Sequence, residues 1–90
     1  MTAPFARQRL AHLESLAAEL SGRGLASRML GADAPVLWVW HPRSRKQIIV
    51  FACPAGEGWL FLWSPDGQER AEDPGQVADL LRKLLDGAPR

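Results

Sequence analysis

The sequence is poor in the residues that small domains use for cross-links and metal sites. It contains one cysteine and two histidines in 90 residues. A single cysteine excludes an intramolecular disulfide, and so few thiol and imidazole groups exclude a cysteine-based zinc site, so we expect no metal and no cofactor. Because small secreted domains usually depend on disulfides, this composition predicts a cytoplasmic protein.

The sequence also lacks a long apolar run and an excess of either charge. No stretch approaches the ~20 apolar residues that a membrane-spanning helix needs, and residues 1–16 carry charges throughout, unlike a signal peptide. The net charge is +1, so no field of the whole molecule would attract nucleic acid or an acidic membrane. Any basic surface must therefore be local.

The remaining composition is that of one small globular domain. The chain is 47% hydrophobic and 23% charged, with 90 residues in all, which is too short for two domains. A chain of this length buries only about 60–65% of its unfolded surface, so its core must be thin. We therefore expect residues 1–90 to form a single α+β domain.

Two segments have the apolar spacing of helices. From about Pro4 to Ser21, leucine and alanine recur every three or four residues, and the following Gly22 can end the helix. The second helix is predicted to begin at Asp73, an N-cap with proline and glutamine in the favoured positions behind it, and to end at Gly87.

The segment between the helices is organised around residues 36–64, which read VLWVWHPRSRKQIIVFACPAGEGWLFLWS and hold all four tryptophans. Its β-branched and aromatic residues, interrupted by prolines, predict three antiparallel strands. These strands are Val36–His41, Lys46–Cys53 and Trp59–Ser64. Leu25–Leu30 is either a short preceding strand or a loop, and residues 68–72 could hold a short edge strand. The expected fold is a three- or four-stranded antiparallel meander flanked by the two helices, in the order α-(β)-β-β-β-α.

The register of these strands predicts which side chains share a face of the sheet. We pair Trp40 with Gln47 and Cys53 with Trp59. One face then carries Val36, Trp38, Trp40, Ile49, Phe51, Trp59, Phe61 and Trp63. The other carries Leu37, Val39, Ile48, Val50, Ala52, Leu60 and Leu62. Both faces are apolar, whereas a sheet with one solvated face should alternate apolar and polar residues.

Two helices of this length can cover one face of a small sheet but hardly both. We expect them to cover the aliphatic face; the alternative is that they cover the aromatic face or straddle the sheet. An open aromatic face would exceed the few hundred Å² of apolar patch that monomers usually expose, and so predicts a partner. The leading hypothesis is a non-catalytic protein-interaction module, chaperone-, adaptor- or regulator-like, that binds itself as a homodimer or another protein. The predicted partner-binding residues are Trp38, Trp40, Phe51, Trp59, Phe61 and Trp63.

The residues that might suggest catalysis do not converge. In the predicted register Cys53 and His41 lie roughly 23 Å apart, far beyond the ~3 Å of a proton transfer. The acidic residues are scattered over helices and loops and form no convergent pair. We therefore predict that the protein is not an enzyme.

The loop HPRSRK, residues 41–46, is the strongest local concentration of positive charge. Arg43, Arg45 and Lys46 lie within four residues of one another and can contact phosphates or an acidic partner; the alternative is a solvated turn. Nucleic-acid binding through this loop is the second function that the sequence allows. A third is binding of a small apolar ligand or peptide on the sheet, and no membrane is expected as a partner.

The order of elements resembles that of known groups. It is similar to double-stranded RNA-binding domains, although residues 73–76 read DPGQ where those domains place a lysine-rich turn. It also looks like the YbjN and type III secretion chaperone-like group, and that resemblance implies a protein-binding dimer. The combination of WHP at 40–42, CP at 53–54 and WLFLWS at 59–64 resembles short uncharacterised actinobacterial proteins and implies no function.

Overall fold

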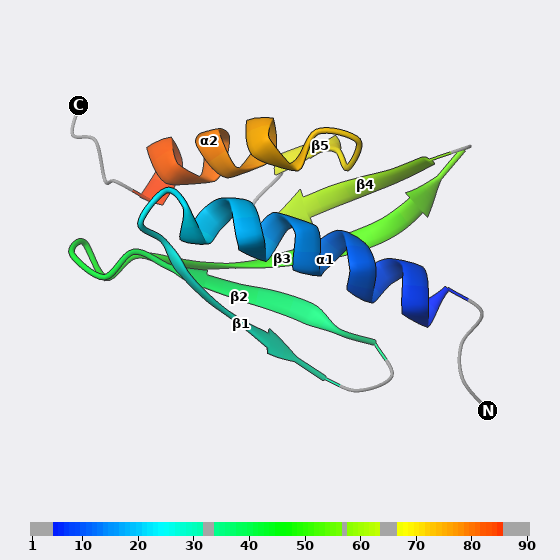
Figure 1. Ribbon diagram of the computed structural model, residues 1–90, viewed down its shortest axis with the longest axis horizontal. Coiled ribbons are helices and arrows are strands. Elements are labelled where there is room, and N and C mark those ends of the chain that lie inside the picture. The colour runs from blue at the N-terminus through cyan, green and yellow to red at the C-terminus, as the bar shows by residue number, and fades with distance from the viewer. Residues whose placement is uncertain (1–4, 32–33, 57, 64–66, 86–90) are drawn as a thin grey trace.

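The structure is a computed structural model that describes residues 5–31, 34–56, 58–63 and 67–85. The elements follow in the order α1 (Ala6–Ser21), β1 (Ala26–Leu30), β2 (Val36–Trp40), β3 (Gln47–Ala55), β4 (Gly58–Trp63), β5 (Gly67–Arg70) and α2 (Pro74–Leu85). The strands form one antiparallel meander in sequence order (Figure 1). The predicted α+β fold with flanking helices is confirmed, while the predicted helix ends at Pro4 and Gly87 lie outside the described residues.

The sheet has five strands rather than three or four. The ambiguous segment before residue 31 is the strand β1, which pairs along its whole length with β2. The fifth strand is β5, whose four residues read GQER and overlap the short edge strand that the sequence allowed over residues 68–72. A short polar strand of this kind has no apolar alternation, so its sequence pattern is a weak signal. It forms because the edge of β4 that faces away from β3 has backbone groups to pair, and residues 67–70 pair with them antiparallel.

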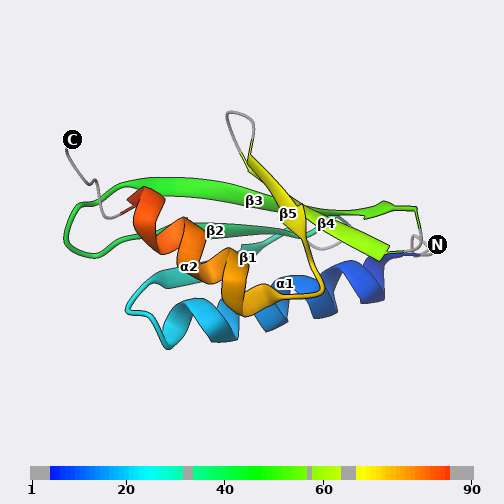
Figure 2. The same ribbon diagram turned by 90° about the horizontal axis from the view of Figure 1, so that it is seen from above.

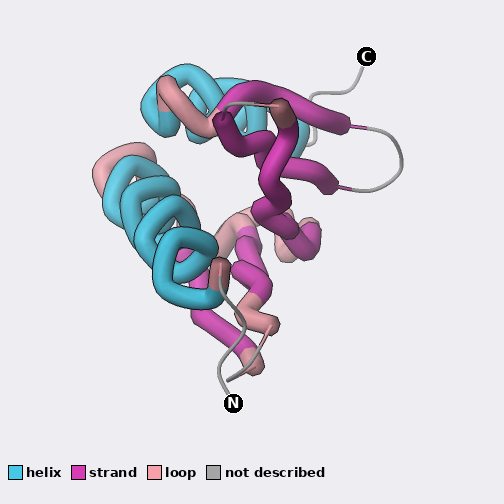
Figure 3. Tube along the Cα trace, turned by 90° about the vertical axis from the view of Figure 1, so that its right-hand side faces the viewer, coloured by secondary structure: helices cyan, strands magenta, loops and turns pink. Residues whose placement is uncertain are grey.

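Both helices lie on one side of the sheet, as Figures 2 and 3 show. The side chains that α1 buries are Leu13, Leu16 and Leu20, and those that α2 buries are Val77, Ala78, Leu81 and Leu85. They pack on Leu37, Val39, Ile48, Val50 and Ala52, which are all buried. The aliphatic residues of β2 and β3 are therefore the covered ones, as expected.

The pairing of β2 with β3 is as predicted, with Trp40 opposite Gln47 and Trp38 opposite Ile49. The predicted pairing of β3 with β4 is wrong by one residue, because Cys53 lies opposite Leu60 rather than Trp59. The sequence reasoning ended β3 before Pro54, whereas β3 continues to Ala55 and turns tightly into Gly58. Since side chains alternate with a period of two, this shift moves every β4 side chain to the other face.

Pro54 is tolerated inside β3 because one side of the strand is a free edge at this point. β2 pairs with β3 only from Gln47 to Val50, and the Ala52 carbonyl, farther along, accepts a hydrogen bond from Arg9 Nε at 3.0 Å. Pro54 comes two residues after Ala52 and presents its nitrogen to the same edge, where no ladder donor is missed.

Candidate binding surfaces

The side of the sheet that faces away from both helices is the first candidate surface, and we call it the open face (Figure 2). Its apolar side chains, which follow from the strand registers, are Leu30, Val36, Trp38, Trp40, Ile49, Phe51, Leu60 and Leu62. Phe51 is the most exposed of them, at 50%. The open face thus joins aromatic residues of β2 and β3 to leucines of β4.

The aromatic groups of the open face are held in place by their neighbours. The rings of Trp38 and Trp40 lie 4.7 Å apart with an interplanar angle of 42°. The Trp38 indole N–H donates a hydrogen bond to the Gln47 side-chain carbonyl at 2.7 Å. A partner that docks here would meet rings that are already ordered, which reduces the entropy cost of binding.

The edges of the open face carry positive charge. Arg28 on β1 lies opposite Trp38, and Arg70 on β5 lies opposite Leu60. Arg70 forms an ion pair with Glu72 at 3.0 Å, and the hydrogen bond between them lowers the pKa of Glu72. None of the described strand positions on this face has an acidic side chain. The surface is therefore an apolar strip with Arg28 at one edge and the Arg70–Glu72 ion pair at the other.

Three of the predicted partner-binding residues lie on the other face. Phe61 is fully buried, and Trp59 and Trp63 are partly buried against the same core. The ring of His12, on α1, contacts two of them: its centroid lies 5.0 Å from that of the Trp59 ring and 6.5 Å from that of the Phe61 ring. The one-residue shift of β4 turns these three rings to the helix side of the sheet and brings Leu60 and Leu62, which the prediction omitted, to the open face. Gly56, at the end of β3, has a φ of +60°, a conformation that suits a tight turn.

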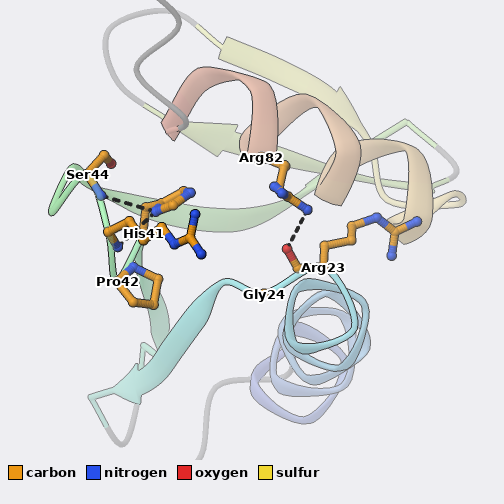
Figure 4. A pocket seen from close by; sticks show the side chains of 7 residues that line it. Arg23, Gly24, His41, Pro42, Ser44 and Arg82 are labelled. Carbon is orange, nitrogen blue, oxygen red and sulfur yellow. Dashed lines mark hydrogen bonds between the residues drawn. The ribbon is translucent and has the colours of Figure 1, made fainter.

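The second candidate surface is a cavity of about 760 Å³ beside the C-terminal end of α1. We call it the basic pocket. Its lining residues are Arg23, Gly24, His41, Pro42, Arg43, Ser44 and Arg82. They come from the turn after α1, from the loop between β2 and β3, and from α2, as Figure 4 shows. Three separate segments therefore bring positive charge to one concavity.

Arg23 is fixed at the rim of the basic pocket by two carboxylates. Its guanidinium lies 2.8 Å from Glu19 and 2.6 Å from Asp79, so it links α1 to α2. These hydrogen bonds, that to Asp79 foremost, raise the pKa of Arg23, and the same bond lowers the pKa of Asp79. Arg82 donates a hydrogen bond to the Arg23 carbonyl at 2.8 Å (Figure 4). The arginine side chains at this end are thereby oriented by contacts within the fold.

The loop between β2 and β3 is ordered by its own polar groups. His41 Nδ1 accepts hydrogen bonds from the backbone N–H groups of Arg43 and Ser44, at 3.1 and 3.2 Å. The Ser44 hydroxyl donates to the Leu85 carbonyl at 2.6 Å and so ties the loop to the end of α2. Arg45 adopts a φ of +64°, a rare conformation that the surrounding hydrogen bonds hold.

The structure divides the predicted basic cluster between two places. Arg43 lines the basic pocket with Arg23 and Arg82. Arg45 and Lys46 line a separate groove of about 660 Å³ that contains Trp38 and Phe51 of the open face. The sequence does not indicate that Arg43 lies near Arg23 and Arg82, because these three arginines are far apart in the chain.

The residues considered for catalysis are well separated. His41 directly follows Trp40, which pairs with Gln47, and Cys53 lies six residues farther along β3, or roughly 20 Å at the rise of a strand. Within the part of the chain that the structure describes, no three histidine, cysteine or acidic side chains gather as a metal site. None of the described helices is long and apolar enough to cross a membrane.

Comparison with known proteins gives one partial match to report. Over 53 residues the chain is 36% identical to a protein of Dickeya dadantii (strain 3937) named "Probable deoxyribonuclease RhsA". The match covers 59% of this chain and 4% of that protein, so the chain spans only a small part of its relative's length. No protein-family model and no solved structure matches the chain. The resemblances drawn from the order of elements therefore stay predictions.

Proposed function

We propose that the protein is a non-catalytic protein-interaction module that binds its partner through the open face. The observation that supports this proposal is an apolar sheet face that neither helix covers (Figure 2). Phe51 and Leu30 on it are 50% and 37% exposed, and large apolar patches of this kind mark interaction sites in soluble domains. The proposed location is the cytoplasm.

The charges at the edges favour a partner with acidic groups around an apolar centre. Arg28 and Arg70 lie on the two outer strands. Arg70 is paired with Glu72, so Arg28 is the arginine that an acidic group of a partner would complement, which speeds association and fixes orientation. We propose a different protein that carries such a group as the partner, and a second copy of this chain is the alternative.

The size of the open face indicates how much more surface the partner must use. Five strands at about 4.8 Å spacing and five residues at about 3.3 Å rise give roughly 400 Å² of flat area. A stable complex usually buries about 800 Å² per partner. The groove beside Arg45 and Lys46 adjoins the open face at Trp38. We propose that the partner extends into this groove and places acidic groups there.

A library of random peptides displayed on phage tests this chemistry. Selection on the immobilised protein should enrich peptides that combine large apolar with acidic residues, and their binding should weaken as salt is added. Phe51→Glu should abolish the binding. Leu80→Glu is the matched control, because Leu80 is 38% exposed but lies on α2, away from the open face.

The opposite outcomes would count against the proposal. If Phe51→Glu leaves peptide binding intact while Leu80→Glu removes it, the helix layer is the docking surface. Sedimentation analysis tests the homodimer: a dimer that Phe51→Glu converts to monomer would show that a second copy occupies the open face. The nuclease activity in the name of the Dickeya protein belongs to a chain of which this one matches 4%, and we propose no such activity here.

A further inference from the structure

We propose, building on the function proposed above, that the partner adds an extended segment of its own chain to a free edge of β3, at Gln47 and Ile49. The added segment lies in the groove of about 660 Å³ that Arg45 and Lys46 line, next to the open face. In this mode of recognition, hydrogen bonds between main chains provide affinity, and contacts of alternate side chains provide specificity.

The free edge follows from the ranges over which β3 is paired. β2 pairs with β3 from Gln47 to Val50, and β4 pairs with it from Val50 to Ala55. From Gln47 to Ile49, β3 therefore has β2 on one side and none of the described strands on the other. A strand edge of this kind is a template on which another strand can pair.

The hydrogen bonds of the ladder show which backbone groups point to the free edge. The His41 N–H donates to the Lys46 carbonyl at 2.9 Å. Bonded and non-bonded residue pairs alternate in an antiparallel ladder, so the N–H and C=O groups of Ile48 point to β2. Those of Gln47 and Ile49 point the opposite way, where no described strand reaches them. They are two donors and two acceptors for an added strand.

The groove beside the free edge presents apolar side chains to both faces of an added strand. Trp38 and Phe51 line it from the open face, and Leu84 lines it from α2. Leu84 is 48% exposed although it belongs to a helix that packs on the core. Successive side chains of a strand point to opposite faces. Alternate residues of the partner would thus contact the two rings, and the residues between them would contact Leu84.

Positive charge at one end of the groove indicates where the partner carries acidic groups. Arg45 and Lys46 directly precede β3 and line the groove. Among the described residues, neither side chain belongs to an ion pair, and no acidic residue lines the groove. All strand pairs in the sheet are antiparallel, and an antiparallel segment would leave the groove beside these two cations. The ligand is therefore an apolar run followed by acidic residues.

N-methylation of a bound peptide tests this inference. The probe is a synthetic copy of the tightest-binding linear peptide from the phage selection, with one amide methylated at a time and its affinity measured by calorimetry. Only alternate amides of an added strand face β3. Methylation should weaken binding about tenfold at every second residue of the bound stretch and leave it within about twofold at the residues between.

Two leucines one helical turn apart on α2 provide matched variants. Leu84→Glu should weaken binding of the same peptide about tenfold, because Leu84 lines the groove. Leu80→Glu should bind within about twofold of the parent protein, because Leu80 is 38% exposed but does not line the groove. At low salt, Lys46→Gln should weaken binding more than Lys83→Gln, which removes the same charge outside the groove.

The outcomes separate the added strand from the function proposed above. If Phe51→Glu abolishes binding while Leu84→Glu has no effect and methylation shows no alternation, the open face is the docking surface and the added strand is overturned. If no selected peptide depends on Phe51, both proposals fail. A dimer of the parent protein in which the Ile49 amide is protected from hydrogen exchange would place a second copy at this edge and would also overturn the inference.

Discussion

The two phenylalanines Phe51 and Phe61 offer a matched test of the sheet described above. They lie on neighbouring strands, but Phe61 is fully buried under the helices whereas Phe51 is 50% exposed on the open face. In the register expected from the sequence both rings would share one face. Replacing each in turn by alanine should therefore separate the two arrangements.

The expected losses of stability differ severalfold. Phe61→Ala should cost about 3–5 kcal/mol, because it removes buried surface and leaves a cavity in a closely packed core. Phe51→Ala should cost about 1 kcal/mol, roughly half the transfer free energy of a buried aromatic side chain. A chain of 90 residues is expected to be stable by about 5–13 kcal/mol in total, so Phe61→Ala should remove a large fraction of it.

Urea unfolding followed by circular dichroism measures both losses. With a slope of about 1–1.5 kcal/mol per molar urea for a domain of this size, Phe61→Ala should lower the midpoint by about 2–5 M and Phe51→Ala by about 1 M or less. Equal losses in the two variants, or a larger loss for Phe51→Ala, would refute the placement of β4 and of the helix layer.

Three further predictions concern the ends of elements and pH. Asp73→Ala should cost about 1 kcal/mol in chemical denaturation, since Asp73 accepts the first-turn amide of α2 at 3.0 Å; no loss would contradict the cap. Gly67→Ala should displace Trp63, which lies where the added methyl would go, and should change tryptophan fluorescence; an unchanged spectrum would count against that packing. Because Arg23 lowers the pKa of Asp79, the ion pair stabilises the fold above the ordinary carboxyl pKa and loses its effect as pH falls through the lowered value. Acid should thus destabilise the parent protein more than Asp79→Asn, and equal acid sensitivity would disprove the link.

Much of the fold follows from local sequence patterns. The cap at Asp73 and the leucines after it place α2, and the turn between Trp40 and Gln47 places the central hairpin in the right register. These elements were predictable because their signals lie within a few residues of the structure that they specify. The division of β2 and β3 into a covered and an uncovered face follows from the same register.

The register of β4 depended on a feature that is not local. A proline normally ends a strand. β3 continues past Pro54 because its pairing with β2 stops at Val50, which leaves that edge of β3 free. The basic pocket could not be predicted for a similar reason, because it joins residues that are far apart in the sequence. Arg23 and Arg82 are 59 positions apart in the chain, and only the packing of α1 against α2 brings them together.

Photo-crosslinking in living cells tests the proposed role of the open face most directly. A benzoylphenylalanine is placed at position 51, and in a second protein at position 80 on α2 as control. We expect a crosslink from position 51 to another protein with an acidic, apolar surface, and none to that protein from position 80. Crosslinks from position 80 alone, or the same crosslinks from both positions, would contradict binding through the open face.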